Sequence, residues 1–120
     1  MNLFKNIFTS ETQNNSFNRI ALTEADQIED IINSSAEKPI LIFKHSTRCG
    51  ISTMILKRFE NKISNHATPY YFLDIIKHRP LSNLIQDKFG VRHQSPQLLV
   101  IKNGKVVAHD SHYGVLEVDL

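Results

Sequence analysis

The sequence is poor in cysteine: its 120 residues contain one, Cys49, and there is no tryptophan. A single thiol cannot form an internal disulfide, so a reducing compartment, the cytoplasm, is expected. Charge of one sign is also scarce, because 14 Lys and Arg stand against 12 Asp and Glu and leave a net charge of +2. An excess this small is typical of an ordinary solvated surface, and we expect no nucleic-acid partner.

Long apolar runs are missing as well. No stretch approaches the roughly 20 apolar residues of a membrane-spanning helix. The first ten residues lack the continuous apolar core and the small-residue cleavage site of a secretory signal. We therefore expect no membrane partner. Residues 1–16 are predicted to be a short N-terminal turn or helix with a polar, flexible connector, and residues 17–120 to form one domain.

The domain begins with a weakly marked strand and a helix. Phe17–Leu22 is the strand candidate. Thr23 then opens a capping box with Asp26, which predicts a helix that ends near Ser35. Pro39–Phe43 is a continuous apolar run after a proline, a pattern typical of a strand buried on both faces of a sheet.

The polar segment Lys44–Arg48 is expected to be a loop that leads into a second helix. From Gly50 onward apolar residues recur every four positions, which predicts about four helical turns. Asn103-Gly104 is a strong signal for a tight hairpin turn. The remaining predicted elements are a strand at Pro69–Ile75, a helix from Pro80 to Gly90, and the two hairpin strands Gln97–Lys102 and Lys105–His109.

This order of elements predicts an α/β domain. Alternating helices and strands followed by a hairpin indicate a central mixed sheet of four or five strands with helices on both faces. The last residues, Ser111–Leu120, leave room only for a truncated final helix. We expect the chain to be a monomer.

Cys49 lies where the exit loop of a buried strand meets the start of a helix. A lone cysteine in a cytosolic domain is most often a buried apolar residue. Here its neighbours, from Ser46 to Gly50, are polar or small. A helix N-terminus also has unpaired N–H groups and a partial positive charge, which stabilise an anion such as a thiolate. Because the thiolate is the nucleophile of thiol exchange, Cys49 is the candidate catalytic residue.

Four residues near Cys49 have candidate roles. Ser52 lies one helical turn further on, and its hydroxyl is expected to donate a hydrogen bond to the sulfur, although it cannot form a disulfide with it. Lys44, His45 and Arg48 are close in sequence and add positive potential if their side chains point toward the thiol. The alternative for each base is an ordinary solvated charge.

Ser95-Pro96 is a second element that points to the same site. Proline directly before an apolar strand restricts Ser95 to extended geometry and donates no hydrogen bond to the sheet. An X-Pro bond is trans about 95% of the time, so the sequence by itself does not indicate a cis bond.

Two stretches carry a family resemblance. Gly90–Val107 resembles the second half of thioredoxins, with a cis-proline loop, a strand, an Asn-Gly hairpin and a returning strand. Phe43–Ser52, which reads Phe-Lys-His-Ser-Thr-Arg-Cys-Gly-Ile-Ser, resembles the signature of the YtxJ family of monothiol bacilliredoxins, thioredoxin-like proteins of the bacterial bacillithiol system. The resemblance covers about Phe17 to Gly114. The chain departs from it at Gly50, where proline is most often found, and in its truncated closing helix.

The resemblance implies roles for particular residues. Cys49 would be the nucleophile, and Ser52 would occupy the position of a resolving cysteine. Pro96 would be cis and face Cys49, and the backbone of Ser95 would pair with an extended thiol substrate. Thr47 belongs to the same motif and is included with Lys44, Arg48, Ser95 and Pro96 in the expected substrate-binding set. The small thiol would be bacillithiol, whose carboxylates Lys44 or Arg48 would pair with.

The expected function is therefore monothiol thiol-disulfide exchange that removes bacillithiol from protein mixed disulfides. Its partners would be bacillithiol as co-substrate, client proteins that carry mixed disulfides, and a regenerating reductase; no tightly bound cofactor and no metal are expected. One alternative follows from Cys-Gly-Ile-Ser, which is close to the Cys-Gly-Phe-Ser of monothiol glutaredoxins: two subunits and two small thiols would share a [2Fe–2S] cluster. Another is a non-catalytic thioredoxin-fold adaptor.

Overall fold

The computed structural model describes residues 19–64 and 68–120. The predictions for residues 1–16 and for the start of the first strand lie outside the described residues. The elements in chain order are β2 (Arg19–Ala21), α1 (Asp26–Ser34), β3 (Ile40–His45), α2 (Gly50–Ser64), β4 (Tyr70–Asp74), α3 (Arg79–Phe89), β5 (Gln97–Lys102), β6 (Lys105–Ser111) and the short 3-10 helix η2 (His112–Glu117).

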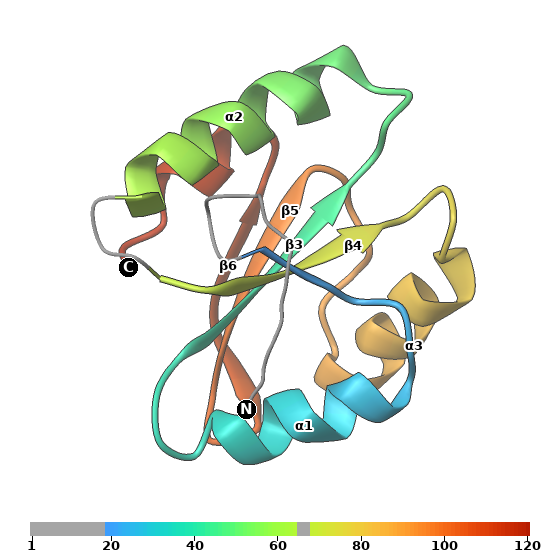
Figure 1. Ribbon diagram of the computed structural model, residues 1–120, viewed down its shortest axis with the longest axis vertical. Coiled ribbons are helices and arrows are strands. Elements are labelled where there is room, and N and C mark those ends of the chain that lie inside the picture. The colour runs from blue at the N-terminus through green and yellow to red at the C-terminus, as the bar shows by residue number, and fades with distance from the viewer. Residues whose placement is uncertain (1–18, 65–67) are drawn as a thin grey trace, which may run out of the picture.

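The strands form one mixed sheet in the order β2-β4-β3-β5-β6. β2 and β3 each run parallel to β4, whereas β5 runs antiparallel to both β3 and β6. Helix α2 and η2 cover one face of the sheet, and α1 and α3 cover the other (Figure 1). The predicted fold class, a mixed sheet flanked by helices with a truncated C-terminal helix, is confirmed.

Strand β3 lies at the centre of the sheet and divides the core into two halves. Ile40 and Ile42 pack with the residues of α1 and α3 on one face, and Leu41 and Phe43 pack with α2 on the other. All six β3 residues are buried. The continuous apolar run predicted this double burial, because side chains of a strand point alternately to its two faces.

Strand β3 ends two residues later than predicted, because Lys44 and His45 belong to it and not to the loop. Lys44 pairs with Leu73 on one side and Gln97 on the other, and His45 pairs with Asp74. Pairing with neighbouring strands keeps the backbone extended although the side chains are polar. The polarity of these two residues indicated a loop, and that prediction was wrong.

The predicted capping box at the start of α1 does not form. The helix begins at Asp26, and no side chain caps its first turn. Instead the side-chain oxygen of Gln27 accepts hydrogen bonds from the backbone N–H groups of Thr23 and Glu24, at 2.8 and 2.9 Å. The longer glutamine reaches back over one more residue than the aspartate does, and it takes the role predicted for Asp26.

The Asn-Gly hairpin between β5 and β6 has the predicted geometry. Asn103 and Gly104 both have positive φ, 53° and 75°, as a tight hairpin turn requires. Their backbone N–H groups donate to the carbonyl and the hydroxyl of Ser35 at the end of α1, both at 2.8 Å. The turn is thereby tied to α1.

Within the described residues, no helix is long and apolar enough to cross a membrane.

Candidate active site around Cys49

Cys49 stands immediately before α2, at the end of a short turn that leaves β3. Its N–H donates to the carbonyl of Ser46 at 3.2 Å, and its own carbonyl accepts from the N–H of Thr53 at 3.2 Å. The cysteine is partly exposed and forms no disulfide. The sulfur therefore lies at the helix N-terminus, where unpaired N–H groups favour negative charge.

Ser52 lies beneath this turn and is fully buried. Its Oγ accepts a hydrogen bond from the N–H of Ser46 at 3.1 Å and shares a second one, 2.8 Å long, with Nδ1 of His45. Within the part of the chain that the structure describes, no hydrogen bond joins Ser52 to Cys49. The Ser52 hydroxyl was expected to donate a hydrogen bond to the Cys49 sulfur. Its hydrogen bonds are instead with the Ser46 backbone and with His45.

His45 is buried at the end of β3, with its ring 5.4 Å from the ring of Phe72. Burial lowers its pKa below the ordinary value of 6.5, and Arg19 lowers it further, whereas Asp74 and Glu60 partly oppose the change. A lowered pKa keeps the imidazole neutral at pH 7. The expectation that His45 adds positive potential near Cys49 is therefore wrong.

Lys44 points to the opposite face of the sheet and has no exposed surface. Its Nζ lies 3.4 Å from the backbone carbonyl of Ser82 in α3. Burial, followed by repulsion from Arg79, lowers its pKa to about 8. The structure therefore does not bring Lys44 to the surface around Cys49, because residues at neighbouring positions of a strand face opposite ways.

Thr47 and Arg48 are both in the turn between Ser46 and Cys49, and both are exposed. The backbone N–H of Arg48 donates to the hydroxyl of Ser46 at 3.3 Å, which fixes the turn and leaves the guanidinium on the surface. Lys44, Thr47 and Arg48 were expected to bind the small thiol. The structure places two of them, Thr47 and Arg48, at the surface next to Cys49.

Ser95-Pro96 lies at the same edge of the sheet as the Cys49 turn. The last residue pair between β3 and β5 is Lys44 with Gln97, so Pro96 lies directly beside the end of β3. The Ser95–Pro96 peptide bond is cis, as the resemblance implied. The Oγ of Ser95 is buried without a hydrogen-bond partner in the described part of the chain. The two loops expected to form the site are thus brought together.

One partly buried polar network was not predicted. Arg19 Nη2 and Glu60 Oε2 form an ion pair of 2.6 Å, and the hydroxyl of Tyr70 donates to the same carboxylate oxygen. Arg19 also lies over the ring of Phe72, 4.3 Å from its centroid. The partners come from β2, α2 and β4, so no local sequence pattern links them.

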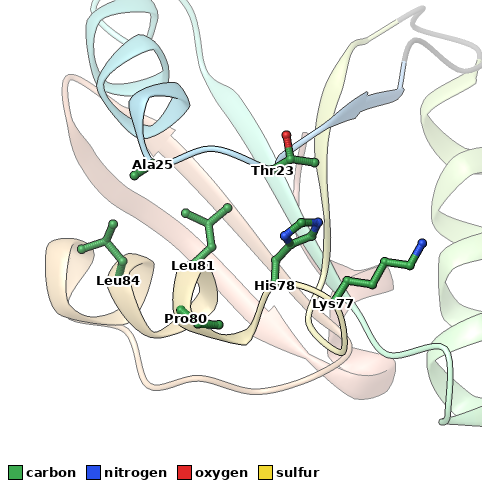
Figure 2. A pocket seen from close by; sticks show the side chains of 7 residues that line it. All are labelled: Thr23, Ala25, Lys77, His78, Pro80, Leu81 and Leu84. Atoms are coloured by element: carbon green, nitrogen blue, oxygen red, sulfur yellow. The ribbon is translucent and has the colours of Figure 1, made fainter.

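A separate hollow of about 320 Å³ lies between the segment that precedes α1 and the segment made of the turn before α3 and the first turns of that helix (Figure 2). Its lining side chains come from these two segments, and they are Thr23, Ala25, Lys77, His78, Pro80, Leu81 and Leu84. None of them belongs to the residues expected around Cys49. We assign this hollow no part in the thiol chemistry.

No metal-binding cluster stands out in residues 19–64 and 68–120. There is no group there of three or more His, Cys, Asp or Glu side chains placed to hold an ion. His109 in β6 and His112 at the start of η2, the closest histidines in the sequence, are both exposed. Each chain has one cysteine, so Cys49 is the one cysteine ligand that a chain could give to an iron–sulfur cluster.

Comparison with known proteins supports the fold and indicates the family of the chain. The family model described as monothiol bacilliredoxin BrxC matches residues 20–120. A solved structure described as an oxidoreductase with a thioredoxin fold is 30% identical, with a TM-score of 0.76 over 83% of this chain and 88% of that one. Thioredoxins from Schistosoma mansoni (17% identity, TM-score 0.66, 82% and 87% covered) and Trypanosoma brucei brucei (12%, 0.66, 87% and 88%) share the fold.

Proposed function

The chain belongs to the monothiol bacilliredoxin family BrxC, and we propose that it removes bacillithiol from protein mixed disulfides through the thiolate of Cys49. The observation that carries this proposal is the position of the chain's one cysteine. The residue is partly exposed at the N-terminus of α2, in a turn that lies beside the Ser95–Pro96 loop. Family and fold indicate thiol-disulfide oxidoreductase chemistry in general, and the single thiol makes it monothiol.

The exchange step is a displacement at sulfur. The Cys49 thiolate attacks the bacillithiol sulfur of the mixed disulfide, and a new S–S bond forms as the bond to the client cysteine breaks. The electron pair leaves with the client sulfur, which takes up a proton and becomes a reduced thiol. Cys49 is left as a mixed disulfide with bacillithiol. The client cysteine is reduced, and Cys49 is oxidised in its place.

Regeneration requires a second thiol from outside the chain. Ser52 occupies the position where a resolving cysteine would stand, and a hydroxyl cannot displace the bound bacillithiol. A free bacillithiol thiolate, or the thiol of a partner reductase, attacks the bacillithiol sulfur on Cys49 and releases the Cys49 thiolate. The product is a disulfide of the attacking thiol, which a cytoplasmic reductase would reduce.

Recognition of the small thiol is assigned to the exposed part of the site. Bacillithiol carries carboxylates, and Arg48 offers an exposed guanidinium one residue from Cys49. Thr47 adds an exposed hydroxyl on the same turn. The backbone of Ser95 would pair with an extended substrate, and its buried hydroxyl, which has no partner in the described part of the chain, is a further donor for it.

The proposal is tested by mass spectrometry of a bacillithiol-modified client protein mixed with this chain. Wild type should acquire the bacillithiol mass on Cys49 while the client is freed, and Cys49→Ala should leave the client modified. The same experiment is repeated with a glutathione-modified client. Faster transfer from the glutathione-modified client would favour a glutaredoxin-like function over a bacilliredoxin function. No transfer from either client by a folded chain would refute the exchange mechanism.

The two alternatives have their own readouts. A shared [2Fe–2S] cluster would give a brown protein after anaerobic purification, with two chains each providing one Cys49 thiolate. A non-catalytic adaptor would have a Cys49 that iodoacetamide does not label near neutral pH. Exchange remains the proposal because the matching family is that of the bacilliredoxins and the cysteine is partly exposed.

A further inference from the structure

We infer that Lys44, Arg79 and His93 form a binding site for a small oxyanion, a phosphate or a carboxylate group. The site lies at the end of β3, on the face of the sheet that α1 and α3 cover, whereas Cys49 precedes α2 on the other face (Figure 1). The inference goes beyond the proposed function, because none of the three residues takes part in the exchange step at Cys49.

Ser82 connects two of the three basic side chains. Its backbone carbonyl lies 3.4 Å from Lys44 Nζ, and its hydroxyl oxygen lies 2.6 Å from His93 Nδ1. Arg79 comes three residues before Ser82 in α3, and residues three apart in a helix are neighbours on one face. Strand β3, helix α3 and the segment before β5 therefore bring three basic groups together.

No acidic side chain compensates these charges. The residues that pair with Lys44 in the neighbouring strands are Leu73 and Gln97, and both are uncharged. Asp74, the acidic residue of β4, pairs with His45 and so lies toward the opposite face of the sheet. In the described part of the chain, no carboxylate forms an ion pair with any of the three basic groups.

The pKa values of the cluster agree with this arrangement. Burial lowers the pKa of His93, and the charges of Lys44 and Arg79 lower it further. Burial, followed by repulsion from Arg79, lowers the pKa of Lys44 to about 8, so this lysine is still mostly charged at pH 7. The three groups repel one another, and a bound anion would relieve that repulsion.

Arg79 and His93 provide the hydrogen-bond donors that a ligand could reach from solvent. The Arg79 side chain is exposed, and its Nε donates to Asn83 Oδ1 at 3.3 Å, which leaves its terminal N–H groups for an oxyanion. His93 is partly exposed, and because Nδ1 is bonded to Ser82, Nε2 is the ring nitrogen that faces a ligand. Arg79 is also the first residue of α3, whose N-terminus adds partial positive charge.

Lys44 would act on the ligand through its charge. It has no exposed surface, and it lies beneath the two outer groups. A buried ammonium with one contact at 3.4 Å destabilises the fold while it is charged. Packing by itself would favour an apolar side chain at this position, and a group placed against stability in this way is typical of a binding site.

The test is a phosphate titration of the full chain at pH 7, with sodium chloride holding the ionic strength constant. The NMR signals of the His93 ring should shift and saturate, with a Kd on the order of 1–10 mM. The ring of His109, exposed in β6, is the internal control and should not shift with the same saturation. A parallel titration with sodium acetate compares the two ligand classes, and the tighter anion identifies the group that the site prefers.

Three variants separate this site from general anion effects. Lys44→Met and Arg79→Gln should each weaken phosphate binding by roughly fivefold, because each removes one positive charge from the cluster. Lys57→Met, at an exposed position of α2, should bind phosphate as wild type does. If neither anion gives a saturable shift at His93, or if Lys44→Met binds phosphate as tightly as wild type, the inference is overturned.

Thermal unfolding gives a second readout. Phosphate stabilises most proteins by exclusion from their surface, and this general effect should be equal in wild type and Lys44→Met. Specific binding should add to it, so at ten times the Kd the melting temperature of wild type should rise by roughly 2–4 °C more than that of the variant. Equal rises would contradict the site. Neither readout uses Cys49 or bacillithiol, so failure of this inference and failure of the proposed function are distinguishable.

Discussion

Lys44 and Gln97 face each other across β3 and β5, and both are buried with incomplete hydrogen bonding. The only hydrogen bond of Lys44 Nζ in the described part of the chain is the 3.4 Å contact with the Ser82 carbonyl, and Gln97 Oε1 has no partner there. No carboxylate from those residues forms an ion pair with the lysine. A buried ammonium with so few partners destabilises the folded chain while it is charged.

Replacing Lys44 should therefore stabilise the protein in a pH-dependent way. The folded chain releases the Lys44 proton near pH 8, whereas the unfolded chain holds it up to about pH 10.5. Because the unfolded chain binds more protons in this interval, the free energy of unfolding of wild type rises with pH across it. Relative to Lys44→Met, the rise should reach about 3 kcal/mol.

Urea unfolding at pH 7, 8, 9 and 10 measures this difference. Lys44→Met should be the more stable protein at pH 7, with the gap closing by pH 10. Lys57→Met, at an exposed position of α2, should follow wild type at every pH. Parallel curves for wild type and Lys44→Met would show that the lysine is not buried as a charge.

Ser52→Cys should convert the chain from a monothiol to a dithiol reductant. A thiol at this position can attack the mixed disulfide on Cys49, which the hydroxyl cannot do. After reaction with a bacillithiol-modified client, the variant should release free bacillithiol and lose two mass units as the internal disulfide forms. Wild type and Ser52→Ala should both retain the bacillithiol adduct, and an adduct that also persists on Ser52→Cys would contradict the assigned position.

Arg48→Gln should slow exchange with acidic small thiols only. The guanidinium is exposed, so its attraction for a carboxylate is partly screened, and we expect a roughly two- to fivefold loss in rate with bacillithiol. Exchange with the uncharged thiol 2-mercaptoethanol should be unchanged. Arg58→Gln, exposed further along α2, provides the matched control. An equal loss with both thiols would mean that Arg48 acts on the sulfur itself.

Tyr70→Phe should weaken the fold without affecting Cys49. The variant removes the hydroxyl that bonds Arg19 and Glu60 in the interior, and it should lower the free energy of unfolding by about 1–2 kcal/mol. Tyr113→Phe, whose side chain is 57% exposed, should change it by less than about 0.5 kcal/mol. Thermal unfolding measures stability, and iodoacetamide labelling at pH 8 should give the wild-type rate for both variants.

Much of the fold could be predicted because its determinants are local. The apolar run before Lys44 predicted the central strand, and the four-residue spacing after Cys49 predicted α2. The Asn103-Gly104 turn was confirmed because positive φ at two successive residues is a backbone requirement that few residue pairs satisfy. The same local signals placed Cys49 at a helix start, which is where the structure has it.

The errors came from polar residues whose environment is set by distant segments. Lys44 and His45 were expected in a loop, because polarity normally indicates solvent, but pairing with neighbouring strands holds them in the sheet. The ion pair of Arg19 with Glu60 joins residues that are 41 positions apart in the sequence. The hydrogen bond of Arg19 with Tyr70 joins residues that are 51 positions apart. Such partners have no spacing rule in the sequence.

Residue type and short-range periodicity were enough to establish most of the helices and strands, the single thiol and the lack of a resolving cysteine. Which way the polar side chains around that thiol point was settled by packing. The folded chain turns Lys44 into the interior, bonds Ser52 to His45 and leaves Arg48 at the surface. The reason is physical: the direction and charge of a side chain depend on its burial and its partners, and packing brings those partners from segments far apart in the chain.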